Sequence, residues 1–333
     1  MKDIAEHFHV SIATVSRALS DNPRISQERR DAIQAYAHEH NFIPNVIGSQ
    51  LRHSKDRPGK MIGVIIPQLP HYFFSTILAG IEEEAAAHGY MILVAKSNEE
   101  YDREVRICQA FYRNKVCGVI VSQAKDTHDY QHFRLFLDNQ IPIVFYDRIC
   151  TGLDVSRVVV DDYMGSFNAV SHLLEVGYRR IAFFGADMTL QISKNRYNGY
   201  MDALYKFGIK PDESLVYLCD NRASAEILVP EVLAREDRPD AFFAVNDDTA
   251  IGILYATKKL GLRVPEDVGI CGFTNGERAV ATDPQLTTVE QRGKRIGEEA
   301  ANILISKVEG LLPVDHVEKR LVRTKLIIRG TTK

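Results

Sequence analysis

A short segment near the N-terminus combines residue types that can recognise DNA. Ser11 precedes a helical pattern over 12–19, and its hydroxyl can accept hydrogen bonds from the first turn of that helix. Side chains left pointing outward at such a helix start can enter a major groove and contact base edges and phosphates. The predicted contacts are Ile12 and Ala13 with thymine methyl groups, Thr14 and Ser16 with phosphates, and Arg17 with a guanine. By itself, however, a helix pair with one arginine is more often structural.

Three short helical patterns, at 2–8, 12–19 and 27–39, would position this segment. One apolar face consists of Ile4, Ala5 and Phe8, and the next consists of Val15, Ala18 and Leu19. Two short helices that meet through a turn of three or four residues form a helix-turn-helix. The sequence therefore predicts a small all-α unit, which the polar and basic stretch 53–60 separates from the rest of the chain.

Composition is ordinary for a globular protein, with 333 residues, 45% hydrophobic and 26% charged. Nine Lys/Arg and seven Asp/Glu lie in residues 1–60, so this segment carries +2 although the whole chain carries −3. That asymmetry is weak evidence for a nucleic-acid partner, and a solvated small domain has the same composition. No apolar run is long enough to span a bilayer, and no secretory signal is recognisable. With five cysteines lacking metal-motif spacing, we expect a cytoplasmic protein with reduced thiols.

From Met61 onward, short apolar runs alternate with amphipathic stretches of helix length. This pattern is typical of parallel α/β sheets that are covered by helices on both faces. The expected strands are 62–66, 90–95, 118–122, 142–146, 157–160, 180–184, 215–219, 241–245 and 268–271. The expected helices are 74–88, 101–114, 165–176, 195–207, 223–234, 247–260 and 293–309. The series pauses at 151–156 and a second series follows from 157–160, which indicates two similar α/β subdomains.

The N-terminal segment resembles the headpiece of the lactose-repressor (LacI) family along its whole length. The resemblance is carried by Val10-Ser11, Thr14-Val15-Ser16-Arg17, Ile25-Ser26, Ile43-Pro44-Asn45 and Leu51. It implies a hinge helix over 44–52 that folds on operator DNA, with Asn45, Leu51 and Arg52 among its DNA contacts. Leu51 matches the leucine that wedges between base pairs in the minor groove and kinks the duplex.

Three positions depart from the usual headpiece pattern. His9 stands in the turn where Gly or Asn is usual, and His tolerates a left-handed backbone better than most side chains. Phe8 replaces a small residue and needs space beside Val15 or Leu19. Gly48 stands in the hinge helix where alanine is usual, and it should destabilise that helix by up to about 1 kcal/mol.

Residues 61–333 resemble the periplasmic-binding-protein-like core of the same family. The matching segments are 246–252 (NDDTAIG), 262–268 (LRVPEDV) and 284–289 (PQLTTV). The resemblance implies a small-molecule effector in the cleft between two α/β lobes. The residues it assigns to that site are Phe73, Phe74, Asp147, Arg148, Asp161, Arg196, Asn246, Asp247, Thr274 and Gln291. Plainer roles remain open for several of them: Phe73 and Phe74 as core, Asp161 and Asn246 as helix caps, and Arg196 as a surface residue.

The expected effector is a sugar, because aromatic faces with carboxylates, amides and an arginine suit its apolar and hydroxyl surfaces. Thr274 replaces the family's usual aspartate, and Leu190 and Ile192 replace side chains that are often polar. We therefore expect a pocket less charged than that of a purine-binding relative. A neutral sugar fits it better than an anionic ligand, although Arg148 and Arg196 leave a sugar phosphate open.

The predicted fold is thus multi-domain, with an all-α helix-turn-helix headpiece and an α/β core of two Rossmann-like lobes. The expected boundaries are 1–43 for the headpiece, 44–60 for the hinge helix and linker, 61–160 with 291–319 for the first lobe, and 161–290 with 320–333 for the second.

The resemblance implies a transcriptional regulator, most often a repressor, that binds pseudo-palindromic double-stranded operator DNA as a homodimer under effector control. No cofactor, metal site or membrane association is expected. The alternative is a sugar-binding receptor without a DNA role. An enzyme is not expected, because the sequence lacks the G-x-G-x-x-G, Walker, G-x-S-x-G and H-E-x-x-H motifs.

Overall fold

The N-terminal helices lie where the sequence predicts them: α1 (Lys2–His7), α2 (Ile12–Leu19) and α3 (Gln27–Glu39). The computed structural model describes residues 1–40, 42, 59–68 and 72–333. Residues 1–59 and 60–333 form two separate units. The small apolar core of the first unit consists of Ile4, Ala5, Val15, Ala18, Ile33 and Ala37.

The two departures at the helix turn are both accommodated. His9 adopts φ 49°, the left-handed conformation expected for it. Phe8 packs edge-on against Tyr36 of α3, with ring centroids 5.5 Å apart, while His7 stacks on the same tyrosine. Space for the larger side chain therefore comes from α3 and its aromatic ring.

The first sheet of the larger unit is entirely parallel and has the order β11-β5-β4-β3-β1-β2. Its strands are β1 (Met61–Ile66), β2 (Met91–Lys96), β3 (Gly118–Val121), β4 (Ile143–Tyr146), β5 (Ser156–Val160) and β11 (Lys319–Val322). Its helices are α5 (Tyr72–Ala87), α6 (Tyr101–Arg113), α7 (Gln131–Leu137) and α13 (Gly293–Val308).

The second sheet has the order β12-β10-β9-β8-β6-β7 and is parallel except for the β10–β12 pair. Its strands are β6 (Ile181–Gly185), β7 (Val216–Leu218), β8 (Ala241–Ala244), β9 (Gly269–Thr274), β10 (Thr287–Glu290) and β12 (Lys325–Ile327). Its helices are α8 (Asp162–Glu175), α9 (Gln191–Lys206), α10 (Arg222–Leu233), α11 (Asp247–Lys259) and α12 (Glu277–Ala281), with a 3-10 turn at Glu213–Leu215.

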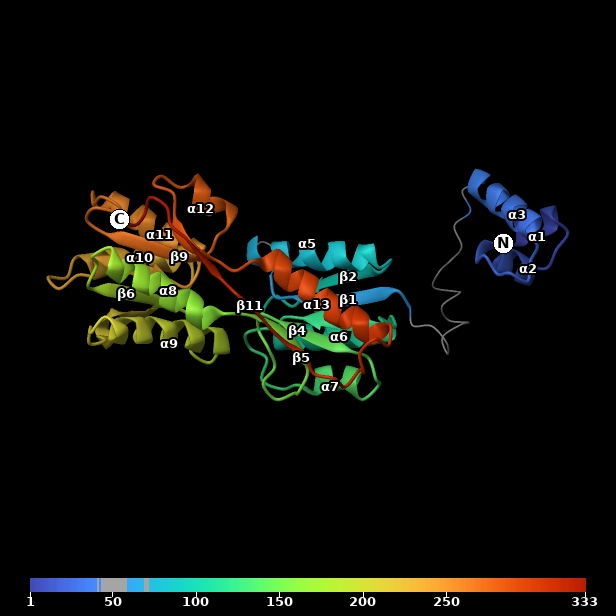
Figure 1. Cartoon of the computed structure of the whole chain (residues 1–333), viewed down its shortest axis with the longest axis horizontal. Helices are drawn as coiled ribbons and strands as arrows, with labels where there is room; N and C mark the ends of the chain where they lie inside the picture. The colour runs from blue at the N-terminus through green and yellow to red at the C-terminus, as the bar shows by residue number, and fades with distance from the viewer. Residues whose placement is uncertain (41, 43–58, 69–71) are drawn as a thin grey trace. The chain divides into compact units, whose positions relative to one another are not determined.

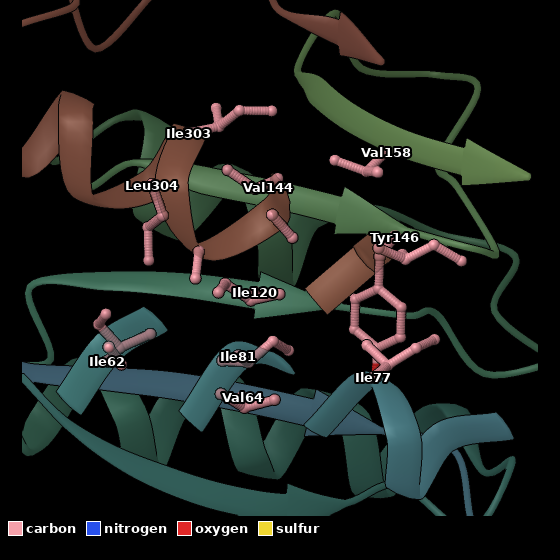
Figure 2. Close-up of a cluster of buried hydrophobic side chains, with 14 of the residues drawn as sticks. Ile62, Val64, Ile77, Ile81, Ile120, Val144, Tyr146, Val158, Ile303 and Leu304 are labelled. Carbon is pink, nitrogen blue, oxygen red and sulfur yellow. The ribbon is translucent and has the colours of Figure 1, made fainter. Parts of the chain in front are cut away.

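Helices cover both faces of each sheet, as continuous apolar strands require. In the first lobe, α5 and α13 pack side by side over one face (Figure 1). Figure 2 shows the resulting core, in which Ile77 and Ile81 of α5 and Leu304 of α13 meet Val64 and Val144 of the sheet. In the second lobe, α8 and α9 pack against the sheet in one hydrophobic cluster, and α10 and α11 pack against it in another.

The division of the core differs from the expected boundaries at one point. Strand β5 pairs with β4, so the pause at 151–156 is a connection within the first lobe. The first sheet also includes β11 as far as Val322, three residues beyond the predicted boundary at 319. The chain therefore crosses between lobes three times: after β5, after β10, and between β11 and β12.

Among the α-helices and β-strands of the described residues, five were not predicted: α7, α12, β10, β11 and β12. They are short, and β11 and β12 carry charged residues at exposed edge positions, so their apolar pattern is weak. All five cysteines are buried free thiols. No helix among the described residues combines the length and the apolar character needed to cross a membrane.

Candidate functional site

The start of α2 presents the side chains that were predicted to read DNA. The Ser11 hydroxyl accepts a hydrogen bond from the backbone N–H of Thr14 at 3.1 Å and so caps the helix. Val15 and Ala18 face the core, which leaves the opposite face outward. On that face Ile12 is 42% exposed, and Ala13 and Arg17 are exposed as well.

Helix α3 holds α2 in place from behind. The Gln34 amide donates to the Ala18 carbonyl at 3.0 Å and to the Asp21 carboxylate at 2.8 Å, and Arg30 donates to the Asp21 carbonyl at 2.9 Å. The end of α2 is thus fixed by side chains, while its N-terminal turn is left for contacts outside the unit. Thr14 and Ser16 are half-buried beside that turn. The other predicted DNA contacts, Asn45, Leu51 and Arg52, lie outside the described residues, as does the expected hinge helix with Gly48.

A cavity of about 400 Å³ lies between the two lobes of the larger unit, where the parallel strands end. This is the place at which open α/β sheets bind small ligands, and the volume lies within the roughly 300–1,000 Å³ typical of such sites. Most of the predicted effector residues line it: Phe73, Phe74, Asp147, Arg148, Arg196, Asn246, Thr274 and Gln291. Leu190 and Ile192 line it too.

Two predicted residues do not line this cavity. Asp161 caps α8, where its side chain accepts from the backbone N–H of Met164 at 3.1 Å. Asp247 is buried and accepts hydrogen bonds from the Gly276 N–H at 2.8 Å and from the Thr288 hydroxyl at 2.5 Å. Burial raises the pKa of Asp247 to about 6, against the lowering effect of these two donors. Both acids therefore hold the protein framework around the cavity.

Arg196 is a buried residue of the cavity wall. Its guanidinium donates to Asp162 at 2.8 Å and to the Val245 carbonyl at 2.5 Å, and it lies 3.9 Å from the centroid of the Phe273 ring. Burial raises the pKa of Asp162, and the neighbouring Arg196 opposes that shift. A further guanidinium nitrogen, Nη2, lies 2.7 Å from the same Asp162 carboxylate, so three of the five N–H groups are used within the protein and two are left for a ligand.

The other cations that line the cavity also have carboxylate partners. Arg148 pairs with Glu99 at 2.5 Å, and the exposed Lys125 pairs with Asp220 at 3.0 Å. Closer to the rim, the remaining pairs are Arg222 with Glu226 at 2.6 Å and Arg278 with Asp248 at 3.1 Å. The positive charges are therefore neutralised within the protein.

Three polar side chains in the cavity wall have no hydrogen-bond partner in the described part of the chain. Asp147 is 5% exposed, and its carboxyl accepts no hydrogen bond from the residues that the structure describes. Gln291 is buried on the crossover after β10, and the Ser193 hydroxyl is an orphan. Burial raises the pKa of Asp147 to about 6, although Arg148 and Arg196 lower it. Buried polar groups are normally paired, so these three indicate where a ligand would form hydrogen bonds.

Asn246 has the double role that the sequence left open. Its side-chain oxygen caps α11 by accepting from the Thr249 N–H at 2.8 Å. Its amide nitrogen donates to the Asp220 carbonyl at 2.7 Å, which ties two loops of the second lobe together beside the cavity. Thr274 ends β9 with φ 146°, a conformation that side-chain-bearing residues rarely adopt, and it remains buried in the wall.

Several lining residues were missed by the sequence interpretation: Gln68, Glu99, Lys125, Ala186, Ser193, Asp220, Asn221, Arg222, Val245, Asp248 and Arg278. Many of them follow a strand of the parallel sheets, for example Glu99 after β2, Lys125 after β3 and Asp220 after β7. The rule that ligands bind at the carboxyl ends of parallel strands could have found these loops. The cavity therefore contains more charged side chains, most of them in ion pairs, than the sequence predicted.

Comparison with known proteins agrees with this division of the chain. Residues 1–45 match the family described as bacterial regulatory proteins, lacI family. Residues 59–329 match the family described as periplasmic binding proteins and sugar binding domain of LacI family.

Individual relatives match over the full length. The chain is 32% identical over 338 residues to the HTH-type transcriptional repressor CytR of Escherichia coli (strain K12), covering 100% of this chain and 96% of that protein. It is 29% identical to the ribose operon repressor of Halalkalibacterium halodurans, covering 100% and 97%. Among solved structures, the lac repressor dimer bound to operator and the anti-inducer ONPF has a similar fold, with a TM-score of 0.86 at 24% identity, covering 99% and 98% of the two chains.

Proposed function

Because the chain belongs to the LacI family of bacterial transcriptional regulators, with a DNA-binding helix-turn-helix and an effector-binding core, we propose that it is a repressor whose operator affinity is controlled by a neutral sugar. It would bind a pseudo-palindromic operator as a homodimer in the cytoplasm. Two-fold symmetry of the protein then mirrors the symmetry of the DNA site, because each headpiece reads one half-site. The five buried free thiols suit a reducing compartment.

The DNA-binding part of this proposal is supported by the exposed face of α2. Arg17, in the last turn of α2, is exposed on the same side of the helix as Ala13, one turn from its N-terminal end. An arginine there can donate two hydrogen bonds to a guanine, while the small apolar side chains contact thymine methyl groups. Thr14 and Ser16 lie beside the turn and can bond phosphates that set the orientation of the helix.

The proposal of a neutral effector is carried by the charge balance of the cavity. Each lysine and arginine that lines it has a carboxylate partner, whereas Asp147 has none of its own in the described chain. An anionic ligand would have to displace one of those partners and would face the Asp147 carboxylate. A polyhydroxylated neutral ligand can instead donate to Asp147, exchange hydrogen bonds with Gln291 and Ser193, and place an apolar C–H face on Phe73 or Phe74.

Control of DNA binding would follow from the three crossovers between the lobes. A ligand bound between the lobes favours one angle between them, and in a dimer that angle sets the separation of the segments leading to the headpieces. A differential affinity of about 1–3 kcal/mol between the two arrangements is enough to change operator occupancy severalfold. The expected hinge helix, with Leu51 as its minor-groove wedge, would then leave the operator on induction.

The test is a selection of bound duplexes from a random DNA library, with and without a panel of neutral sugars. We expect an enriched near-palindrome with a flexible central pyrimidine–purine step, lost when one sugar is added. Binding that needs the sugar would indicate a co-repressor in place of an inducer. Sugar binding without any enriched DNA sequence would contradict the repressor and support the receptor alternative.

A further inference from the structure

A second hollow of about 220 Å³ adjoins the 400 Å³ cavity between the lobes, which we call the effector cavity. Most of the residues that line this second hollow were not predicted to bind an effector. The two hollows share the wall formed by Asp147 and Arg148 of the first lobe and Leu190 and Ile192 of the second. A ligand that contacts Asp147 can therefore extend from one hollow into the other, because no helix or strand separates them. We name the smaller hollow the outer compartment.

The lining of the outer compartment has the chemistry of a saccharide site. Hydroxyl and amide groups come from both lobes, with Thr151 on one side and Thr189 and Gln191 on the other. Tyr130 adds an aromatic ring, and its hydroxyl forms no hydrogen bond within the described chain. An aromatic face beside several hydroxyl and amide groups is suited to a sugar ring, whose C–H face is apolar and whose edge carries hydroxyls.

One buried polar atom of this wall also lacks a partner. Gln123, the second residue after β3, is 9% exposed, and its side-chain oxygen forms no hydrogen bond in the described residues. Such a group costs free energy unless it gains a donor, directly or through water. A hydroxyl group of a ligand in the outer compartment can donate this hydrogen bond once the Gln123 amide has rotated slightly.

The wall is held in place before any ligand arrives. Glu104 of α6 is fully buried and accepts three hydrogen bonds: from the Ala124 N–H at 2.7 Å, the Thr127 hydroxyl at 2.7 Å and His132 at 3.0 Å. Ala124 and Thr127 lie in the loop between Gln123 and α7, and His132 lies in the first turn of α7. The buried carboxylate thus fixes this loop against the helix that follows it, and preorganised polar groups bind with a smaller loss of entropy.

We propose that the effector has two sugar-sized parts, so that it is a disaccharide or glycoside with one unit against Asp147 and the second in the outer compartment beside Tyr130. This inference rests on the proposed function and narrows its ligand class. The second unit is uncharged, because Lys125 and Arg148 are already paired with Asp220 and Glu99. The exposed Lys194 at the rim has no ion-pair partner in the described chain, so anionic sugars belong in the test.

The experiment is calorimetric titration of the full-length protein with maltose, cellobiose, lactose and sucrose, with their component monosaccharides, and with glucose 6-phosphate. One disaccharide should bind at least about tenfold more tightly than either of its components, a ratio that corresponds to one or two added hydrogen bonds. A monosaccharide that binds as tightly as every disaccharide would overturn the proposal while leaving sugar control intact. Tighter binding of glucose 6-phosphate would also overturn it, and an absence of binding by the whole panel would overturn the sugar effector itself.

Variants locate the second unit. Thr189 is exposed on a loop and lines only the outer compartment, so Thr189→Trp should fill that space without disturbing the core. We expect about a tenfold loss of disaccharide affinity with monosaccharide affinity unchanged within about twofold. Met188→Trp places the same bulk one residue away, outside both hollows, and should change neither. Gln191→Ala, a milder truncation, should give a smaller loss in the same direction. Equal losses for both sugars, or none, would contradict the assignment.

Discussion

Lys125 of the first lobe donates to the Asp220 carboxylate of the second lobe at 3.0 Å, and this is an ion pair that links the two lobes directly at the effector cavity. The backbone on both sides is anchored. The Lys125 N–H donates to Glu99 at 3.0 Å, and the Asp220 carbonyl accepts from the Asn246 amide at 2.7 Å. The pair therefore connects two fixed loops across the opening between the lobes.

This pair should favour the arrangement of lobes seen here. Both side chains are partly exposed, so its contribution is modest, about 0.2–1 kcal/mol. We expect Lys125→Asp to weaken effector binding severalfold and the double variant Lys125→Asp with Asp220→Lys to recover most of the loss. Titration of effector affinity at two salt concentrations checks this, because screening should remove the difference. A double variant no better than the single one would show that the loss is local to Lys125.

Arg17 should carry a large share of operator specificity. Arg17 is exposed on the face of α2 that is proposed to contact DNA, and a bidentate contact with guanine contributes about 1–3 kcal/mol of discrimination. Arg17→Ala should weaken operator binding by about tenfold to a hundredfold, as measured by fluorescence anisotropy, with effector affinity unchanged. The matched control is Arg113→Ala, an exposed arginine at the end of α6 in the core, which should leave both affinities unaltered. Equal weakening on operator and random DNA would assign Arg17 to phosphate contact only.

Effector binding should depend on pH through Asp147. Burial raises the pKa of this carboxyl from 3.8 to about 6, with Arg148 and Arg196 lowering it and Asp162 and Glu99 raising it. A sugar hydroxyl donates to the ionised form, so affinity should rise as pH increases from about 5 and level off above about 7. In Asp147→Asn this rise should disappear, whereas Asp247, whose pKa is also about 6, stays in the variant as an internal control. An unchanged pH profile in the variant would assign the titration to another group.

Asp147 should also make the free energy of unfolding depend on pH. A carboxyl with a raised pKa contributes stability that is present below its unfolded value and lost as pH rises through its folded value. The protein without effector should therefore lose the Asp147 contribution between about pH 4 and pH 6, and Asp147→Asn should lose less over that window. Thermal melts of the full-length protein at pH 4 and pH 7, one on each side of that window, measure the difference. A larger loss in the variant would contradict the burial of this carboxyl.

The core of the first lobe depends on a close approach of α5 and α13. A Cβ on Gly297 of α13 would lie 2.1 Å from the Ile77 carbonyl oxygen of α5, and one on Gly80 of α5 would lie 2.1 Å from the Lys294 carbonyl oxygen. Gly297→Ala should therefore force the helices apart and lower the stability of the core by about 1–3 kcal/mol despite its better helix propensity. Asn302→Ala, at an exposed position of α13, is the control and should be neutral or slightly stabilising. Urea unfolding of both variants compares their stabilities with that of the unmodified protein. An unchanged midpoint for Gly297→Ala would contradict the close packing of α5 and α13.

The headpiece and most of the core were predictable because their patterns are strong and local. Helices α2 and α3 begin and end at the predicted residues, since an apolar face and the Ser11 cap define α2. The elements that were missed are short or lie at sheet edges, where tertiary pairing decides the structure and periodicity is weak. The pause at 151–156 is a connection within the first sheet, because β5 pairs with β4, and it does not mark the change of lobe.

The cavity was predictable to a smaller degree. Residues such as Phe73 and Gln291 were found through the family resemblance and line the cavity. Asp161 and Asp247 share the residue type of a ligand contact, but their local hydrogen bonds use them as framework groups. The pairing of Lys125 with Asp220 could not be predicted, because it joins loops from two lobes that no local pattern relates.

Control of the headpiece by a small molecule between the lobes can be tested on the full-length protein. Its affinity for the selected operator is measured at fixed salt, with and without the sugar that the core binds. Saturating sugar should weaken operator binding by at least about tenfold, and operator DNA should weaken sugar binding by the same factor, because coupling is reciprocal. Operator affinity that stays the same at saturating sugar would show that the two sites are not coupled.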